Sequence, residues 1–399
     1  MRKAMMFAVI LAALACLRPA PVLCVEAAPG LTPEQALGKM LYSEKDLSLN
    51  RNQSCQSCHH PDAGFADPRN AADPFRLPVS EGTNTGMFGG RNAPTAAYAA
   101  YSPAFAWDQA ARRYVGGQFW DGRAKTLEEQ AGGPPMNPVE MAMPGRDVVG
   151  GRLAERPEYV QAFRDVYGVD PAKAPPEIVF DRMAQAIAAY ERTAEVCAFS
   201  SKFDAWLAGQ ASLNRMELMG YRFFLRAGCA NCHSAQPERA PGGSAVPPLF
   251  TDFSYHNLGL PRNLALPGGA DAPPDLGLGG VAAVQAADPE GLQRGRFKVP
   301  TLRNVARTAP YGHNGVFRTL EELVSFYNTR DMLPTCPEGG AASARPCWRA
   351  PEVAENVNRT DMGRLGMCPM QVRAIVAFLN TLTDGWTRPG TSLSVAYRP

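Results

Sequence analysis

The chain has 399 residues, of which 45% are hydrophobic, and a formal net charge of +2. This length is sufficient for two domains of ordinary size. The nearly neutral balance of charge argues against nucleic acid as a partner.

The N-terminus predicts a secretory signal peptide over residues 1–27. Basic residues precede the apolar run Met5–Cys16, and small residues follow up to Ala27. These are the charged, hydrophobic and cleavage regions of an export signal. The run is too short to span a membrane, and neither Cys16 nor Cys24 follows a good lipobox. No second hydrophobic span follows, so we expect a soluble periplasmic protein.

The mature chain begins with a helix signal, because Thr32 can cap a helix and Pro33 suits its first turn. The apolar stripe of this helix consists of Leu37, Met40 and Leu41. A similar pattern recurs over Met216–Leu225. Each of the two predicted helices is followed by a cysteine motif, which is how small c-type cytochromes begin.

The two motifs are Cys55-Gln56-Ser57-Cys58-His59 and Cys229-Ala230-Asn231-Cys232-His233. In this spacing each thiol can bond one haem vinyl group, and the next residue places an imidazole beneath the iron. A lone pair of such cysteines is also compatible with a thioredoxin-like redox site. A zinc site joining all four cysteines would leave both histidines unexplained. We therefore predict two covalently bound haem c groups.

Four further cysteines remain in the mature chain, and an even number in an oxidising compartment suggests disulfides. Cys336 and Cys347 enclose a short loop and form a natural pair. A pair between Cys197 and Cys368 follows only by elimination.

No segment alternates convincingly with the period of a strand, so the sequence predicts an all-α fold with two cytochrome c-like domains and long irregular loops. A helix is predicted over Asp181–Glu191, with a boundary near residues 195–212. The predicted domains are 28–195 and 196–399. The stretch Pro237–Gly295 is rich in Pro and Gly and is expected to be irregular. Its His256 either approaches a haem edge or is a structural loop histidine.

Two more helices are predicted towards the C-terminus. Thr319 and Glu322 form a capping box that opens the first. The last helix carries apolar residues on one face, and it is expected to pack across the Met216–Leu225 helix. That face consists of Val372, Ile375, Val376, Leu379 and Leu382.

Five further motifs make a resemblance specific. They are Gly90–Thr95, Phe119–Arg123, Pro138–Met141, Phe297–Val305 and Ala309–Gly315. In this order around two haem motifs they resemble the bacterial dihaem cytochrome c peroxidase and MauG family, over residues 32 to 385. The resemblance implies that His59 ligates a peroxide-reacting haem in the N-terminal domain and that His233 ligates an electron-transfer haem in the C-terminal one. It also implies that Trp120 relays electrons between them; the alternative for Trp120 is simple core packing.

Glu140 matches the position of the family's proton-transferring carboxylate. Cleavage of peroxide needs a base that takes a proton from one oxygen and gives it to the other. By resemblance, Gln130 orients the peroxide and Pro134 lines the same side. Without this context, Glu140 would be read as a solvated surface acid.

The resemblance also implies a calcium ion bound between the haems by Asn92, Thr308 and Pro310, whose uncharged oxygens suit a hard cation. Arg303 is expected to pair with a haem propionate.

Two departures from the peroxidase pattern stand out. Reductively activated peroxidases carry a histidine after the first haem motif, but none lies between His60 and Asn92, so the first haem should be open at rest. Fourteen residues after His313, where peroxidases place an axial methionine, stands Tyr327. MauG proteins have tyrosine there. Tyr327 is therefore the expected second ligand of the second haem, with Met332 as competitor and core packing as the alternative role for the tyrosine.

Three functions follow from different classes. The first is a peroxidase that reduces hydrogen peroxide with electrons from a small cytochrome c or copper protein. The second is a MauG-like enzyme that oxidises residues of a partner protein, and the third is a dihaem electron carrier. Both enzymes need an open iron and Glu140, whereas the carrier needs neither. The resemblance also implies that a homodimer is possible.

Overall fold

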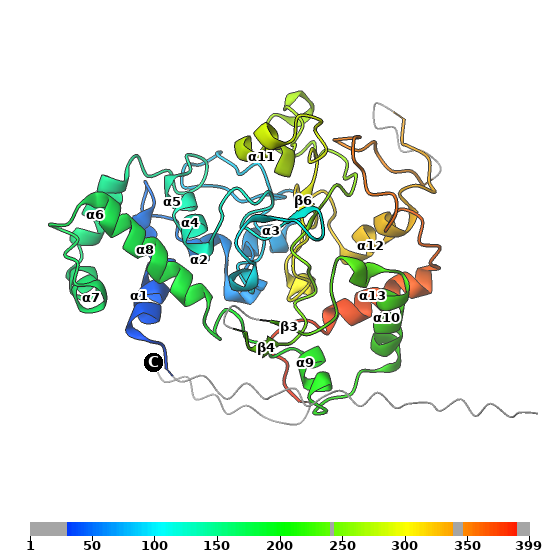
Figure 1. Ribbon diagram of the computed structural model, residues 1–399, viewed down its shortest axis with the longest axis horizontal. Coiled ribbons are helices and arrows are strands. Elements are labelled where there is room, and N and C mark those ends of the chain that lie inside the picture. Colours follow the sequence, from blue (N-terminus) through cyan, green and yellow to red (C-terminus); the bar gives the residue numbers. More distant parts are fainter. Residues whose placement is uncertain (1–29, 240–242, 338–345, 389–399) are drawn as a thin grey trace, which may run out of the picture.

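The computed structural model describes residues 30–239, 243–337 and 346–388. The predicted signal peptide lies outside these residues. Figure 1 shows one group of helices around α1 and α8, a second around α10 and α13, and long loops between them. No helix in the described ranges has the length and apolar character needed to cross a membrane.

The helices of the first group and the loops beside it are α1 (Pro33–Tyr42), α2 (Cys55–Cys58), α3 (Pro68–Ala72), α4 (Leu127–Ala131), α5 (Gly133–Met136), α6 (Arg146–Ala154), α7 (Pro157–Tyr167) and α8 (Pro176–Glu191). The others are α9 (Lys202–Leu207), α10 (Arg215–Arg226), α11 (Ala282–Ala287), α12 (Leu320–Thr329) and α13 (Pro369–Asn380).

Three antiparallel ribbons of two strands each occur among the described residues, a detail that the all-α prediction did not include. They pair β1 (Ala106–Asp108) with β2 (Arg113–Val115), β3 (Glu238–Arg239) with β4 (Ala245–Val246), and β5 (Tyr255–His256) with β6 (Phe297–Lys298). Strands of two or three residues are too short to display an alternating pattern in sequence. The fold is nevertheless helical with little sheet.

Each of the two groups contains one closely packed helix pair, and a glycine lies at the contact in each pair. A Cβ atom on Gly38 of α1 would lie 1.9 Å from the carbonyl oxygen of Ala186 in α8. A Cβ atom on Gly220 of α10 would lie 1.8 Å from the carbonyl oxygen of Ala374 in α13. Only glycine allows backbones to approach this closely. The predicted packing of the last helix against the Met216–Leu225 segment is thus confirmed.

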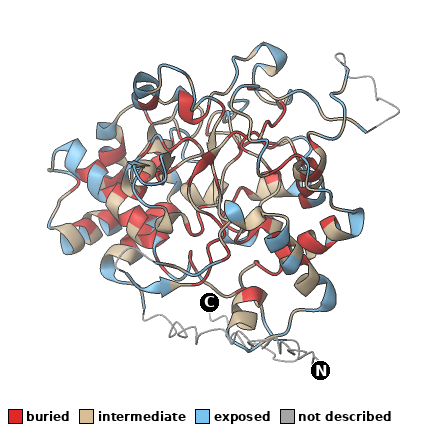
Figure 2. Ribbon diagram, turned by 45° about the vertical axis from the view of Figure 1, so that its right-hand side comes forward, coloured by how far each residue is buried: buried red, intermediate tan, exposed pale blue. Residues whose placement is uncertain are grey.

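Two hydrophobic clusters correspond to these helix pairs. The first extends from Leu37 to Cys197 and takes Leu249 from the later part of the chain. The second extends from Phe203 to Leu382. Figure 2 shows buried residues on the inner sides of both helix groups and along the loops between them.

Some details of the predicted helices were wrong. Helix α13 ends at Asn380, so Leu382 of its predicted apolar face lies beyond the helix. Helix α8 begins at Pro176 and not at Asp181, because proline is tolerated in a first turn and Val179 and Phe180 extend the buried face. In α1, Thr32 forms the capping box with Gln35. Met40 is exposed and does not belong to the buried stripe.

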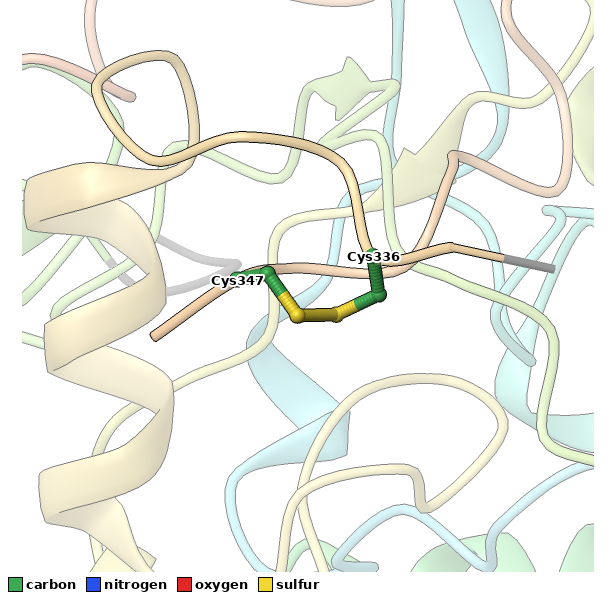
Figure 3. Close-up of a disulfide and its surroundings, with 2 residues drawn as sticks. All are labelled: Cys336 and Cys347. Carbon is green, nitrogen blue, oxygen red and sulfur yellow. A yellow bond between two sulfur atoms is a disulfide. The ribbon is translucent and has the colours of Figure 1, made fainter. Parts of the chain in front are cut away.

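The disulfide between Cys336 and Cys347 is confirmed, with Cα atoms 5.0 Å apart (Figure 3). The pair between Cys197 and Cys368 is not formed, and both thiols are free. Cys197 is buried in the first cluster, whereas Cys368 is exposed at the start of α13. An even count of cysteines therefore did not predict the second pair.

Candidate functional site

The first cysteine motif lies on the wall of a cavity. Cys55 and Cys58 occupy the single turn of α2, and both line this cavity together with His59. The Nδ1 atom of His59 lies 3.1 Å from the carbonyl oxygen of Phe65. Burial lowers the pKa of His59. The ring is thus held through one nitrogen, and its Nε2 atom is left for a metal.

Three residues predicted for the peroxide-reacting side belong to the lining of this cavity. Gln130 from α4, Pro134 from α5 and Glu140 from the following loop all line it. Asn137 donates a hydrogen bond to Glu140 Oε1 (2.7 Å). Desolvation raises the pKa of Glu140, although nearby Arg123 and the Asn137 amide oppose the shift.

The segment that bears Glu140 is held by the loop between His60 and Asn92, which contains no histidine. A Cβ atom on Gly82 would lie 2.3 Å from the carbonyl oxygen of Val139, and the Thr83 amide donates to the carbonyl oxygen of Glu140 (2.7 Å). Ser80, Glu81 and Gly82 line the cavity. Among the described residues that line it, His59 provides the only imidazole.

The second motif lines a second cavity. Cys229, Cys232 and His233 lie on its wall, and His233 Nδ1 lies 2.9 Å from the carbonyl oxygen of Phe250. His256 lies at the edge of the same cavity, where its Nε2 atom is 3.1 Å from Ser254 Oγ and 3.5 Å from Cys232 Sγ.

Tyr327 lines this second cavity from α12, which begins at the predicted capping box of Thr319 and Glu322. Burial raises the pKa of Tyr327. Met332 is 55% exposed and is not part of the lining. Two other methionines, Met362 and Met367, do line the cavity, and sequence reasoning missed both because no motif marks them.

Asn92 and Trp120 line both cavities. The Trp120 indole donates a hydrogen bond to the carbonyl oxygen of Asn92 (2.8 Å), and the backbone N–H of Asn92 donates to the carbonyl oxygen of His313 (2.8 Å). The two cavities therefore share a wall in which Trp120 is held in place.

The three residues predicted to bind calcium, Asn92, Thr308 and Pro310, all line the second cavity near this wall. No group of three or more His, Cys, Asp or Glu side chains suited to a metal occurs in the described parts of the chain. The calcium site at Asn92, Thr308 and Pro310 stays a prediction.

Arg303 lies outside the lining of both cavities. It is fully buried, and its guanidinium forms a bidentate ion pair with Asp204, with both distances 2.9 Å, while Nε donates to the carbonyl oxygen of Pro248 (2.8 Å). The Asp204 carboxylate holds these donors in the structure described here. The predicted pairing with a haem propionate stays a prediction.

The sequence did not mark a polar network beside the shared wall. Arg91 pairs with Asp121 (2.6 Å) and Asp275 (2.7 Å).

His313 lines the second cavity, stacks on Phe297 with ring centroids 3.5 Å apart, and has a buried Nε2 atom without a hydrogen-bond partner. Burial lowers the pKa of His313 to about 3. In the sequence, His313 was marked only by its position in the motif Ala309–Gly315.

Glu191 was also missed, since it follows the buried face of α8 without a motif of its own. It is 5% exposed and lines the first cavity, and its Oε2 atom has no hydrogen-bond partner. Burial raises its pKa to about 8.

The residues present fit two haem groups. Each cavity has a free cysteine pair, an anchored imidazole and an apolar wall. Burial raises the pKa of the Cys58 and Cys232 thiols to about 12, so they are not adapted to act as thiolates. His313 Nε2 and Glu191 Oε2 are buried polar atoms without a hydrogen-bond partner, and they belong to residues that line the two cavities. The fold and site thus define a dihaem oxidoreductase.

Comparison with known proteins gives the family. Residues 32–212 match the family described as di-haem cytochrome c peroxidase. The chain is 43% identical over 383 residues to the methylamine utilization protein MauG of Paracoccus denitrificans, covering 94% of each chain. It is 36% identical over 299 residues to cytochrome c551 peroxidase of Nitrosomonas europaea, covering 74% of this chain and 73% of that one. The chain belongs to the di-haem cytochrome c peroxidase family.

A solved structure shows the same fold. The diheme peroxidase BthA from Burkholderia thailandensis superposes with a TM-score of 0.74 at 32% identity, over 92% of this chain and 90% of that chain.

Proposed function

We propose that this protein reduces hydrogen peroxide to water at a haem c held by Cys55, Cys58 and His59. A haem iron with one free face supplies the redox chemistry when it is bound there. The observation that carries the proposal is the placement of Glu140 in a cavity whose lining offers no imidazole other than His59 among the residues described. The described lining therefore contains no second histidine that would occupy the site where peroxide binds.

Glu140 is proposed to move the proton. Its carboxylate takes a proton from the inner oxygen of peroxide and returns it to the outer oxygen, which leaves as water. Gln130 holds the peroxide by its amide, and Asn137 keeps the carboxylate in orientation (2.7 Å). Two electrons and two protons per peroxide complete the reduction to two molecules of water.

A second haem c, held by Cys229, Cys232 and His233, is proposed to pass these electrons on. Its cavity adjoins the first along the wall that contains Trp120, which supports the relay role of this residue. Tyr327 is proposed as the second protein residue that would hold this haem iron, since it lines the cavity while Met332 is exposed. The two hydrophobic clusters support a division into haem domains near residues 195–212.

The remaining parts of the proposal concern location and partners. The signal-like N-terminus supports export to the periplasm, where a small cytochrome c or copper protein is the proposed donor. Calcium is proposed at Asn92, Thr308 and Pro310, which lie together on the second cavity. The experiment that tests the proposal is a peroxide-consumption assay with a reduced small cytochrome c, in which wild type is compared with Glu140→Gln.

A MauG-like oxidation of a partner protein is the second candidate. Two observations favour it: the likeness to MauG of Paracoccus denitrificans covers 94% of both chains, and Tyr327 stands at the second cavity. A phenolate favours highly oxidised iron, which suits an oxidant more than an electron reservoir. An electron carrier would leave Glu140 and Gln130 without a role.

A further inference from the structure

A surface hairpin near the shared wall carries an exposed indole. Trp107 lies on β1 and is 39% exposed. It is paired across the hairpin with Tyr114 of β2, and the two rings meet edge to face with centroids 4.9 Å apart. Cross-strand aromatic pairs of this kind stabilise a short ribbon, but the contact does not end at the hairpin.

A continuous series of rings leads inward from this pair. Phe105 stacks on Tyr114 with centroids 5.2 Å apart and planes 1° from parallel. Phe105 then meets Tyr255 of β5 edge to face at 6.1 Å. Tyr255 is 3% exposed, so the series runs from solvent to the interior. We call Trp107, Tyr114, Phe105 and Tyr255 the aromatic chain.

The inner end of the aromatic chain lies against the segment that carries Trp120. A Cβ atom on Gly122 would lie 2.2 Å from Tyr255 Oη and 2.8 Å from the Phe105 ring, so this glycine lets both rings approach. Tyr255 is the strand partner of Lys298, whose amide donates to the carbonyl oxygen of Trp120 (2.8 Å). The aromatic chain therefore ends against the backbone segment that contains Trp120.

The chemistry of the four rings differs along the chain. The Tyr255 hydroxyl donates to the carbonyl oxygen of Gly116 (2.5 Å), which is a poor proton acceptor, and burial raises the pKa of Tyr255. Phe105 has no ionisable proton. The exposed Trp107 can release its indole proton to solvent when it loses an electron. Oxidation is thus favoured at Trp107, the outer end of the aromatic chain, and not at its inner rings.

We propose that Trp107 is a surface oxidation site for aromatic one-electron donors that are too large for the cavities. One electron moves from Trp107 along the aromatic chain to the haems after peroxide has oxidised them, and the indole proton leaves to water. A donor then returns one electron to Trp107, which regains its proton. Two such cycles reduce one peroxide to two waters and oxidise two donor molecules. The proposal rests on the proposed reaction of the protein with peroxide at the haem of His59.

The first test treats the ferric holoenzyme with peroxide in the absence of a donor. We expect a tryptophan radical in electron paramagnetic resonance spectra and added oxygen at Trp107 in peptide mass spectra. Trp107→Phe keeps the ring against Tyr114 and should lose the radical signal. Tyr114→Leu interrupts the chain and should lose oxygen addition at Trp107. Trp386→Phe removes an indole that has no aromatic contact in the described chain, and it should change neither signal.

Glu140→Gln separates enzymatic from direct oxidation, because peroxide that attacks the exposed indole in solution would still modify Trp107 in this variant. Trp120→Phe distinguishes the proposed relay role of Trp120 from the proposed surface oxidation site at Trp107. If oxidation at Trp107 persists in Trp120→Phe but is lost in Tyr114→Leu, the relay role fails and the surface site stands. Equal oxidation of Trp107 in wild type and Tyr114→Leu would overturn the surface site.

A kinetic test uses the dye ABTS as the bulky donor. Trp107→Phe should lower kcat for ABTS oxidation while haem content and the rate at which the haems react with peroxide stay at the wild-type level. An unchanged kcat would show that this dye delivers its electrons elsewhere, which would contradict the proposal.

Discussion

The indole of Trp120 donates a hydrogen bond to the carbonyl oxygen of Asn92 at 2.8 Å, and both residues line both cavities. This contact joins two of the motifs that mark the family. It fixes an oxidisable ring in the wall that separates the two proposed haems. The indole N–H is also satisfied, as a buried polar group requires.

Haem attachment is predicted to be covalent at both motifs. Wild-type protein made in a host that matures c-type cytochromes should carry two haems that survive denaturation, as measured by pyridine haemochrome and intact mass. Cys229→Ala combined with Cys232→Ala should leave one. Replacing the free, exposed Cys368 by Ala is the matched control and should leave two. Zinc or a single haem in wild type would refute this prediction.

Glu140→Gln should lower peroxide turnover by about 10²–10⁴, because the amide keeps the size of the side chain but cannot accept the proton. Glu129→Gln, on the exposed side of α4, is the control and should have wild-type activity. Haem content should be unchanged in both variants. Full activity of Glu140→Gln would place proton transfer at another residue.

The pH dependence of turnover should report the same carboxyl group. Burial raises the pKa of Glu140, and a base works only when it is deprotonated. Turnover should therefore fall as the pH decreases through a pKa above that of an exposed glutamate, and this acid limb should vanish in Glu140→Gln. Persistence of the limb in the variant would assign it to another group.

Tyr327→Met is predicted to raise the reduction potential of the second haem, because a neutral thioether favours ferrous iron whereas a phenolate favours ferric iron. The variant should also shorten the life of the oxidised state that forms after peroxide is added. Tyr311→Phe is the control, since Tyr311 lines the same cavity but its hydroxyl donates to the carbonyl oxygen of Val305 (3.0 Å). Spectroelectrochemical titration measures both potentials, and equal values for Tyr327→Met and wild type would exclude the ligand role.

Gly220→Ala should destabilise the second helix group. Its methyl group would collide with the carbonyl oxygen of Ala374, and overpacking of this kind costs about 1–3 kcal/mol or more. Gly151→Ala in α6 meets nothing within 4 Å, and alanine is the better helix former by about 1 kcal/mol. Thermal unfolding of the holo-protein should show a lower Tm for the first variant and an equal or higher Tm for the second.

Helices α1 and α12 could be predicted because the signals at their N-termini are local. Thr32 and Thr319 cap helices through side-chain contacts three residues away. The network of Arg91 with Asp121 and Asp275 could not be predicted, because these residues come together only when long loops fold. Arg303 illustrates the same limit, since its partner Asp204 lies 99 positions away in the sequence.

Site residues were found through motifs, and residues without a motif were missed. Glu140 belongs to the motif Pro138–Met141, and Gln130 was assigned by the family resemblance. The structure brings both to one cavity with His59. Met362, Met367 and Glu191 reach the cavities from segments whose sequences carry no such pattern. The disulfide between Cys197 and Cys368, inferred by elimination, was also wrong, because the number of cysteines does not say which of them lie close together.

Low-temperature electron paramagnetic resonance of the resting ferric protein tests the central claim, since it reports the coordination of both irons at once. We predict one high-spin signal from the haem of His59, whose cavity offers no other imidazole among its described lining residues, and one low-spin signal from the haem of His233 and Tyr327. Peroxide should react with this ferric form without prior reduction. Low-spin signals from both haems, or an oxidised enzyme that needs an electron before its first turnover, would contradict the account.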